Sequence, residues 1–247
     1  MPAPKKHSYK QKFKVSSYDL TPGSRARLTS LANFFQEIAY QHAGRLGFGY
    51  QDLKDQDTFW VLSRMRIRVE RYPLWDEEIE VETWPNGAEK IFAIREFRVK
   101  DSEGKTIARA STAWLIVSAT SRRPVRVSEL YSQFRDKVES VFDTSLDKIM
   151  LPESMQHVEL RAVKYSDLDI VSHVNNVKYI EWSLDQLAAE ELKDHPVKDI
   201  EINFMHESRI GDEVEITISR ESKDTIYISG KRLSDNKEIY RTKLQNS

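Results

Sequence analysis

The chain has 247 residues, of which 39% are hydrophobic and 31% charged, and its formal net charge is -1. This composition is typical of a globular protein with one large or two small domains, and the near-zero charge argues against bulk nucleic-acid binding. Because the chain has no cysteine, disulfides, thiolate metal sites and a cysteine nucleophile are excluded.

Neither a membrane span nor a secretory signal is predicted. No apolar run approaches the roughly 18 residues that cross a bilayer, and the basic start, residues 1–7, is not followed by the apolar segment of a signal peptide. The six histidines show no ligand spacing, and no Gly-rich phosphate loop is present. We therefore expect no metal and no cofactor.

The first predicted helix is amphipathic. Leu28, Leu31, Phe35 and Ile38 lie on one face of a helix because their spacing follows its 3.6-residue period. Residues 64–69 and 78–83 then alternate between apolar and charged side chains, which is typical of half-buried strands. Asp101, Ser102, Glu103 and Gly104 form a predicted hairpin turn.

Residues 119–156 fit neither pattern. They contain a basic turn, Arg122–Pro124, and a helical stretch from about Leu130 to Phe142. We interpret this segment as a linker that packs against the protein surface.

The same order of elements then recurs. The apolar positions of a second predicted helix are Val174, Val177, Ile180, Leu184 and Leu187. Residues 200–204 and 213–217 alternate like strands, and residues 234–236 form a second predicted hairpin turn. Each half thus consists of a strand, one long helix and about four antiparallel strands, an α+β layer arrangement. We infer a domain duplication with an offset of roughly 135 to 145 residues.

A candidate reaction centre lies at the start of the second predicted helix. Asp169 lies four residues before His173 in a polar turn, directly followed by Val174, Asn175 and Asn176. A helix N-terminus presents unpaired backbone N–H groups and positive potential. An acid, an imidazole and oxyanion-stabilising groups together favour acyl chemistry. Residues 23–29 of the first copy contain no carboxylate or imidazole, so one centre per chain is predicted.

The motif from Asp169 to Tyr179, Asp-x-x-x-His-Val-Asn-Asn-x-x-Tyr, resembles the double-hotdog acyl-ACP thioesterases of plants and bacteria. The resemblance extends from about Tyr18 to about Thr242 and includes residues 60–67, 71–75, 80–85, 108–114 and 120–124. It implies a tandem (double) hotdog fold, in which each antiparallel sheet wraps around one long helix. The expected domains are an N-terminal hotdog (1–128), a linker with a helical segment (129–156) and a C-terminal hotdog with the catalytic residues (157–247).

The resemblance implies hydrolysis of fatty acyl-ACP to free fatty acid and holo-ACP. It places the catalytic residues at Asp169, His173 and Glu207. Val171 replaces the asparagine of the family, and Ser208 replaces the cysteine that follows the glutamate. Because the thiol is missing and the carboxylates are retained, we favour direct attack by water over an acyl-enzyme. Supporting roles are expected for Ser208, Asn175, Asn176 and Val174, the two asparagines mainly as helix-start residues.

The position of Glu207 is left open by the sequence. Strict alternation along residues 200–208 puts His206 on the apolar face, with Ile202 and Phe204, and Glu207 on the opposite face. The resemblance favours Glu207, whereas the alternation favours His206.

Substrate contacts are expected in the first half. The resemblance implies that the first hotdog shapes an acyl-chain tunnel, for which the candidates are Leu31, Phe34, Phe35, Ile38 and Trp60. Two basic patches are candidates for docking the acidic carrier protein: Arg64, Arg66 and Arg68 in the first, and Arg122, Arg123 and Arg126 in the second. The alternative for the first patch is a solvated strand face paired with Glu70, Glu78 and Glu80.

Two other functions compete with this interpretation. A hotdog thioesterase acting on acyl-CoA differs only in its carrier, which the motif does not encode, and a non-catalytic acyl-carrier-binding module is favoured by Val171 and the missing thiol. A dehydratase fits less well. No counterpart of a plant transit peptide is found, so we expect a bacterial, cytoplasmic enzyme. No membrane or nucleic-acid partner is expected. The duplication supplies within one chain the pairing that single hotdogs achieve by dimerising, which is compatible with a monomer, whereas the resemblance implies a homodimer.

Overall fold

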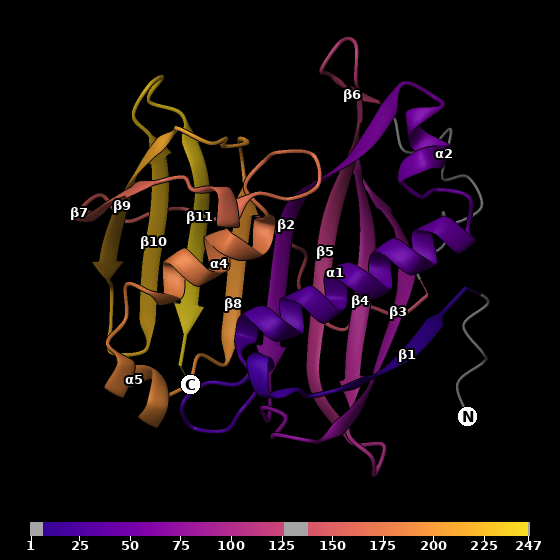
Figure 1. Ribbon diagram of the computed structural model, residues 1–247, viewed down its shortest axis with the longest axis horizontal. Helices are drawn as coiled ribbons and strands as arrows, with labels where there is room; N and C mark the ends of the chain where they lie inside the picture. The colour runs from indigo at the N-terminus through magenta and orange to yellow at the C-terminus, as the bar shows by residue number, and fades with distance from the viewer. Residues whose placement is uncertain (1–6, 126–137, 247) are drawn as a thin grey trace. The chain divides into compact units, whose positions relative to one another are not determined.

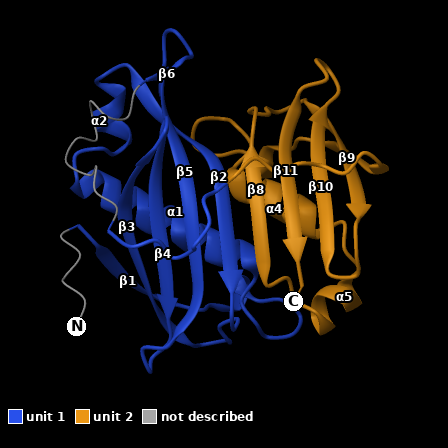
Figure 2. Ribbon diagram, turned by 180° about the vertical axis from the view of Figure 1, so that it is seen from behind, with its two compact units in different colours: residues 1–146 blue, residues 147–247 orange. Residues whose placement is uncertain are grey.

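The computed structural model describes residues 7–125 and 138–246. The chain divides into two compact units, residues 1–146 and 147–247, which are coloured separately in Figure 2. Each unit contains one antiparallel sheet and one principal helix, so the predicted α+β class is confirmed. The domain limits at residues 128 and 157 stay a proposal.

The first unit is built around helix α1 (Leu28–Arg45). Its other elements are β1 (Tyr9–Lys14), η1 (Ser17–Asp19), α2 (Tyr50–Lys54), β2 (Thr58–Val69), β3 (Glu78–Glu89), β4 (Phe92–Lys100), β5 (Thr106–Ser118) and β6 (Pro124–Val125). The sheet has the order β1-β3-β4-β5-β2, and β6 pairs with β5. The predicted turn at residues 101–104 joins β4 to β5, with Gly104 at φ 81°.

Helix α1 lies across one face of the first sheet (Figure 1). Leu28, Leu31, Phe35 and Ile38 are all buried, and the ring of Phe35 lies 5.0 Å from that of Phe97 on β4. Burying one such side chain stabilises the fold by about 1.5–3 kcal/mol. The predicted helix is therefore confirmed, and it continues to Arg45.

Residues 138–146 pack on this unit as an irregular segment. Val141 and Phe142 form an apolar cluster with Trp84 of β3. The side-chain oxygen of Asn86 accepts hydrogen bonds from the N–H groups of Val138 (2.8 Å) and Glu139 (3.2 Å). These residues contain no helix, and most of the predicted helical stretch, residues 130–137, lies outside the described residues.

The second unit repeats this arrangement around helix α4 (Asn176–Leu184). Its other elements are β7 (Gln156–Ala162), η3 (Tyr165–Asp167), α5 (Ala189–Asp194), β8 (Asp199–Phe204), β9 (Glu213–Arg220), β10 (Thr225–Arg232) and β11 (Glu238–Gln245). The sheet has the order β8-β11-β10-β9-β7. The predicted strands and the turn between β10 and β11 are confirmed. Helix α4 is shorter than its apolar pattern, because Val174 precedes it and Leu187 follows it.

Glu96 on β4 is a buried carboxyl in the first unit. Its side chain accepts a hydrogen bond of 3.0 Å from Asn86. Burial raises the pKa of Glu96 from 4.5 to about 7, against the opposing effect of hydrogen bonds from Asn86 and Ser111. The folded chain therefore keeps a proton that the unfolded chain loses, so this group destabilises the fold increasingly as pH rises from about 4.5 to 7.

We expect Glu96→Gln to be stabilised relative to the wild type as pH rises through this window, by up to about 3 kcal/mol above pH 7. Denaturant unfolding of both proteins at several pH values measures the difference. His42, whose pKa burial lowers to about 3, is present in both proteins, so its own pH dependence cancels. A stability difference that does not change with pH would contradict the raised pKa of Glu96.

Candidate active site

Asp169 organises the loop that carries His173. Its Oδ1 accepts hydrogen bonds from the N–H groups of Val171 (2.9 Å) and His173 (3.1 Å), and its own N–H donates to the carbonyl of His173 (2.7 Å). Ser172 closes the turn at φ 63°, in the left-handed region. In the described part of the chain, the other carboxylate oxygen of Asp169 has no hydrogen-bond partner, so it is available to a ligand.

The loop that carries His173 is hydrogen-bonded to residues 205–212, the segment that follows strand β8. Val174 donates its N–H to the carbonyl of Ser208 (2.9 Å), and Asn175 donates its N–H to the carbonyl of Asp167 (2.8 Å). Asn175 also caps α4, because its side-chain oxygen accepts from the N–H of Val177 (3.0 Å).

These bonds narrow the choice of an oxyanion-binding group. The N–H groups of Val174, Asn175 and Val177 are all occupied. Asn176 is the first helical residue, and its N–H has no intrahelical acceptor and no other acceptor within residues 7–125 and 138–246. Its position at the positive end of the helix dipole suits a developing negative charge.

Glu207, not His206, lies beside His173. One carboxylate oxygen of Glu207 is 3.3 Å from Nε2 of His173, whereas Nδ1 of His206 contacts the carbonyl of Glu238 at 2.7 Å. Strand β8 ends at Phe204, so the alternation that favoured His206 does not extend to these residues.

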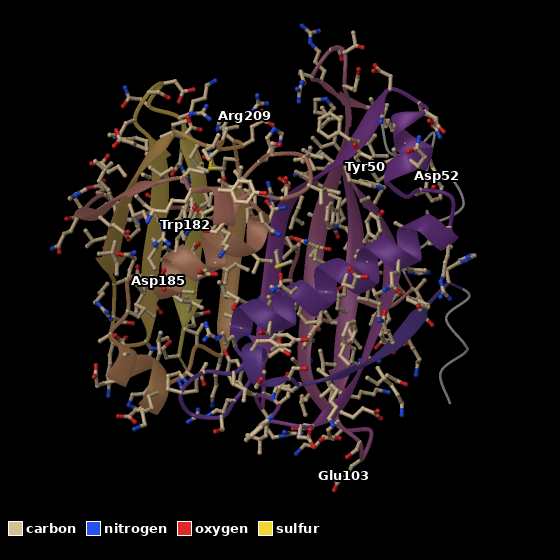
Figure 3. All side chains as sticks on the ribbon, viewed as in Figure 1. Tyr50, Asp52, Glu103, Trp182, Asp185 and Arg209 are labelled. Carbon is tan, nitrogen blue, oxygen red and sulfur yellow. The ribbon has the colours of Figure 1, made fainter. Side chains whose placement is uncertain are left out.

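Arg209 completes this cluster and was missed by the sequence analysis. Its Nη2 donates to Oε1 of Glu207 (2.7 Å) and lies 3.1 Å from Nε2 of His173. Figure 3 labels Arg209 near the upper edge of the second unit, above Trp182 and Asp185. No periodicity or motif in the sequence singles out Arg209, because the contact depends on two loops far apart in the chain.

Ser208 is separated from this cluster. Its side chain is fully buried, and its hydroxyl has no hydrogen-bond partner among the described residues. Burial raises the pKa of the nearby Tyr179 to about 12, against a smaller opposing effect of Ser208. Within the described residues, neither His173 nor Glu207 contacts the Ser208 hydroxyl. Val171, 43% exposed, brings no polar side-chain atom to the site.

The candidate tunnel residues all lie in the first unit. Leu31, Phe35 and Ile38 belong to helix α1, and all three are buried. Phe34 stacks on Phe13 at 4.7 Å, and Trp60 donates its indole N–H to the carbonyl of Phe48 (2.9 Å).

The first basic patch contacts the segment 138–146. Arg64 donates to the carbonyl of Leu146, Arg66 donates to Thr144 (3.1 Å), and the guanidinium of Arg68 lies over the ring of Phe142. The expected partners of this patch are paired elsewhere: Glu70 with Arg109, Glu78 with Lys12 and Glu80 with Lys10. The alternative that paired these glutamates with the arginines is therefore wrong.

The second basic patch lies at the turn before β6. Arg122, at φ 55°, and Arg123 are exposed, and Arg126 lies outside the described residues.

In the described ranges, no group of three or more His, Asp or Glu side chains is placed to hold a metal ion. No helix in the same ranges is both long and apolar enough to cross a membrane.

The first unit contains an equivalent pair of hydrogen-bonded loops, but different side chains occupy the positions of the candidate site. Leu20 bridges Ala26 as Leu168 bridges Val174, and Ser24 has φ 56° as Ser172 has 63°. The equivalent of the hydrogen bond between Val174 and Ser208 runs from Ala26 N–H to the carbonyl of Pro73 (2.8 Å). The residues that take the places of Asp169, His173, Glu207 and Arg209 are Thr21, Arg25, Tyr72 and Leu74. The prediction of a first copy without a carboxylate or an imidazole agrees with this placement.

The fold and the duplicated loops define a tandem hotdog protein with one candidate centre. Residues 6–134 match the acyl-ACP thioesterase N-terminal domain, and residues 152–245 match the acyl-ACP thioesterase C-terminal domain. The chain belongs to the acyl-ACP thioesterase family.

Individual relatives agree with this assignment. The crystal structure of an acyl-ACP thioesterase from Bacteroides thetaiotaomicron is 27% identical, with a TM-score of 0.87 and 97% of each chain covered. A chloroplastic palmitoyl-acyl carrier protein thioesterase from Gossypium hirsutum is 30% identical over 81% of this chain and 52% of its own length. The oleoyl-acyl carrier protein thioesterase 2 from Arabidopsis thaliana is 30% identical over 89% of this chain and 65% of its own length. The chain thus spans about half to two thirds of these plant relatives.

The two roles of Asp169, loop closure and negative charge, are separable by substitution. Asp169→Ala removes the acceptor of two backbone N–H groups, so we expect a loss of about 1–2 kcal/mol in unfolding free energy. Asp169→Asn keeps an oxygen in the same place, so we expect most of that stability to be retained. Urea unfolding of the wild type and both variants measures this. Equal stability of the two variants would show that the side chain does not hold the loop.

Proposed function

We propose that this protein hydrolyses the thioester of fatty acyl-ACP to free fatty acid and holo-ACP. Family membership supports the reaction class and the substrate. The observation that carries the proposal is the placement of the Glu207 carboxylate 3.3 Å from Nε2 of His173, on the loops that also position the unoccupied N–H of Asn176. A base-capable pair and an oxyanion donor are the two elements that acyl transfer to water requires.

The proposed reaction is a single attack by water. The carboxylate of Glu207, which lies beside His173, takes a proton from water as the water oxygen bonds to the thioester carbon. The carbonyl oxygen of the thioester becomes negative and accepts a hydrogen bond from the N–H of Asn176. The C–S bond then breaks, and the proton passes to the departing pantetheine sulfur. The free oxygen of Asp169 lies on the same loop as His173 and supplies a second carboxylate to the site.

Ser208 does not act as a nucleophile in this mechanism. A serine needs a neighbouring base to become reactive, and in the described residues its hydroxyl is buried without contact to His173 or Glu207. Detection of an acyl group on Ser208 by mass spectrometry would overturn the water mechanism.

We assign substrate binding to the first unit and the exposed turn before β6. The buried side chains of Leu31, Phe35 and Ile38 suit the wall of an acyl-chain tunnel. Because the first basic patch contacts residues 142–146, Arg122 and Arg123 are the better candidates for docking the acidic carrier protein. A cytoplasmic location and a homodimer stay predictions.

The function is tested by thiol release from matched panels of acyl-ACPs and acyl-CoAs. We expect the wild type to prefer acyl-ACP, and we expect Asp169→Asn and Glu207→Gln each to lose about 100-fold or more in kcat, since both remove a charge from the site. Faster turnover of acyl-CoA would move the protein to the acyl-CoA thioesterases. Tight binding of acyl-ACP without thiol release would indicate a binding module.

The oxyanion donor is tested by Asn176→Pro. Proline is well tolerated at the first position of a helix, and the extended conformation of Asn175, at φ -60° and ψ 135°, suits a residue that precedes proline. The substitution therefore replaces the N–H with a ring carbon and removes the side-chain amide while keeping the helix, and we expect kcat to fall by about 100- to 1000-fold. Asn176→Ala, which keeps the N–H, is the matched control. Equal activity of the two variants would exclude this N–H.

A further inference from the structure

Arg209 contacts both members of the proposed catalytic pair. Its Nη2 donates to Oε1 of Glu207 at 2.7 Å and lies 3.1 Å from Nε2 of His173. The second oxygen of Glu207 is 3.3 Å from the same imidazole nitrogen. Arg209 and Glu207 therefore both lie within hydrogen-bond distance of Nε2 of His173. This nitrogen either accepts a hydrogen bond from Arg209 or donates one to Glu207, but it cannot do both.

A guanidinium group only donates hydrogen bonds. When Arg209 donates to Nε2 of His173, that nitrogen is an acceptor, and the hydrogen of the neutral imidazole lies on Nδ1. A hydrogen bond from Nε2 to Glu207 requires the opposite tautomer or the imidazolium. Arg209 thus selects the tautomer of His173, and the carboxylate of Glu207 accepts its hydrogen bond from Arg209.

The turn that carries Arg209 does not need its side chain. The N–H of Arg209 donates to Oδ2 of Asp212 (2.8 Å), and Gly211 provides the left-handed residue at φ 87°. Arg232 supports the turn from β10, because its Nη1 donates to the carbonyl of Glu207 (2.7 Å) and to Asp212 (3.4 Å).

The first unit shows that the arginine is specific to the reactive copy. The equivalent turn has Leu74 in the place of Arg209, and its N–H donates to Oε2 of Glu77 at 2.9 Å. Asp76 takes the left-handed position of Gly211, at φ 66°. The same backbone therefore forms with an apolar side chain where Arg25 and Tyr72 take the places of His173 and Glu207, so the fold alone does not require Arg209.

We propose that Arg209 is a positioning residue that fixes the tautomer of His173 and orients the carboxylate of Glu207; this inference rests on the proposed function for its kinetic consequence only. The other charged groups around the pair are Asp169 on the His173 loop, Asp212 in the turn, and Arg232 with its partner Asp235 at the end of β10. Arg209 is the one cation among them whose guanidinium contacts both His173 and Glu207 in the described chain.

The test compares Arg209→Leu, the residue of the first unit, with Arg209→Lys. In Arg209→Leu we expect kcat to fall by about 10- to 100-fold because the pair is misaligned, with KM for acyl-ACP unchanged. Arg209→Lys keeps the charge without the planar guanidinium, so it should restore only part of kcat.

Arg220→Leu is the matched control, since Arg220 forms a two-point pair with Glu191 (3.0 Å for each bond) elsewhere on the same unit. An Arg209→Leu variant with the wild-type kcat would overturn the proposal. A higher KM with unchanged kcat would also overturn it, because it would assign Arg209 to carrier binding.

The tautomer is measured independently of activity. In protein labelled with 15N-histidine, the signal of His173 is assigned by its loss in His173→Gln. We expect the Nδ1–H pattern in the wild type and a change to the Nε2–H or doubly protonated pattern in Arg209→Leu. An unchanged pattern would overturn the positioning role even if hydrolysis is established. The expected change without hydrolysis of any thioester would leave the positioning role standing and reject the proposed function.

Discussion

One backbone hydrogen bond, from the N–H of Val174 to the carbonyl of Ser208, determines where the reactive groups lie. It joins the loop before α4 to the loop after β8, so His173 and Glu207 approach each other although they are distant in sequence. Because the bond uses only backbone atoms, the side chains on either side are free to vary. The contact between Ala26 and Pro73 in the first unit uses the same bond for a different set of side chains. The duplication thus provides two copies of one scaffold, of which one carries the acid–imidazole pair.

The two copies also separate what the fold requires from what the chemistry requires. The buried carboxylate that closes the turn before the loop is present in both, as Asp19 and Asp167, and each accepts a backbone N–H three residues earlier. By contrast, Thr21 takes the place of Asp169 in the first unit, and the loop still forms. The N–H of Thr21 donates to the carbonyl of Arg25 at 2.8 Å. A carboxylate at that place is therefore not demanded by the backbone, which supports a chemical role for the oxygen of Asp169 that the loop leaves free.

The sequence predicted the parts of the fold that depend on periodicity. The stripe on α1 and the alternation in residues 64–69 and 200–204 reflect burial on one face, and burial follows the period of the element. The choice between His206 and Glu207 was not predictable in this way, because the period ends with β8 at Phe204. Nor did any pattern reveal that Arg64 and Arg66 contact residues 144–146, since an irregular segment leaves no periodic signal. Asp169 and His173 were recognised through a motif, and Arg209 lies outside it.

The exposure of Arg209 indicates why its contribution is better sought in catalysis than in stability. Its side chain is 55% exposed and that of Glu207 is 42% exposed, and ion pairs at such positions stabilise a fold by about 0–1 kcal/mol because water screens them. The contacts of Arg209 still have a defined direction, because a planar guanidinium presents its hydrogens along fixed axes. Arg209 therefore orients the carboxylate of Glu207 and the imidazole of His173. Removing it should therefore leave the fold intact and disturb only the relation between Glu207 and His173, which makes the leucine of the first unit a suitable substitute in the second.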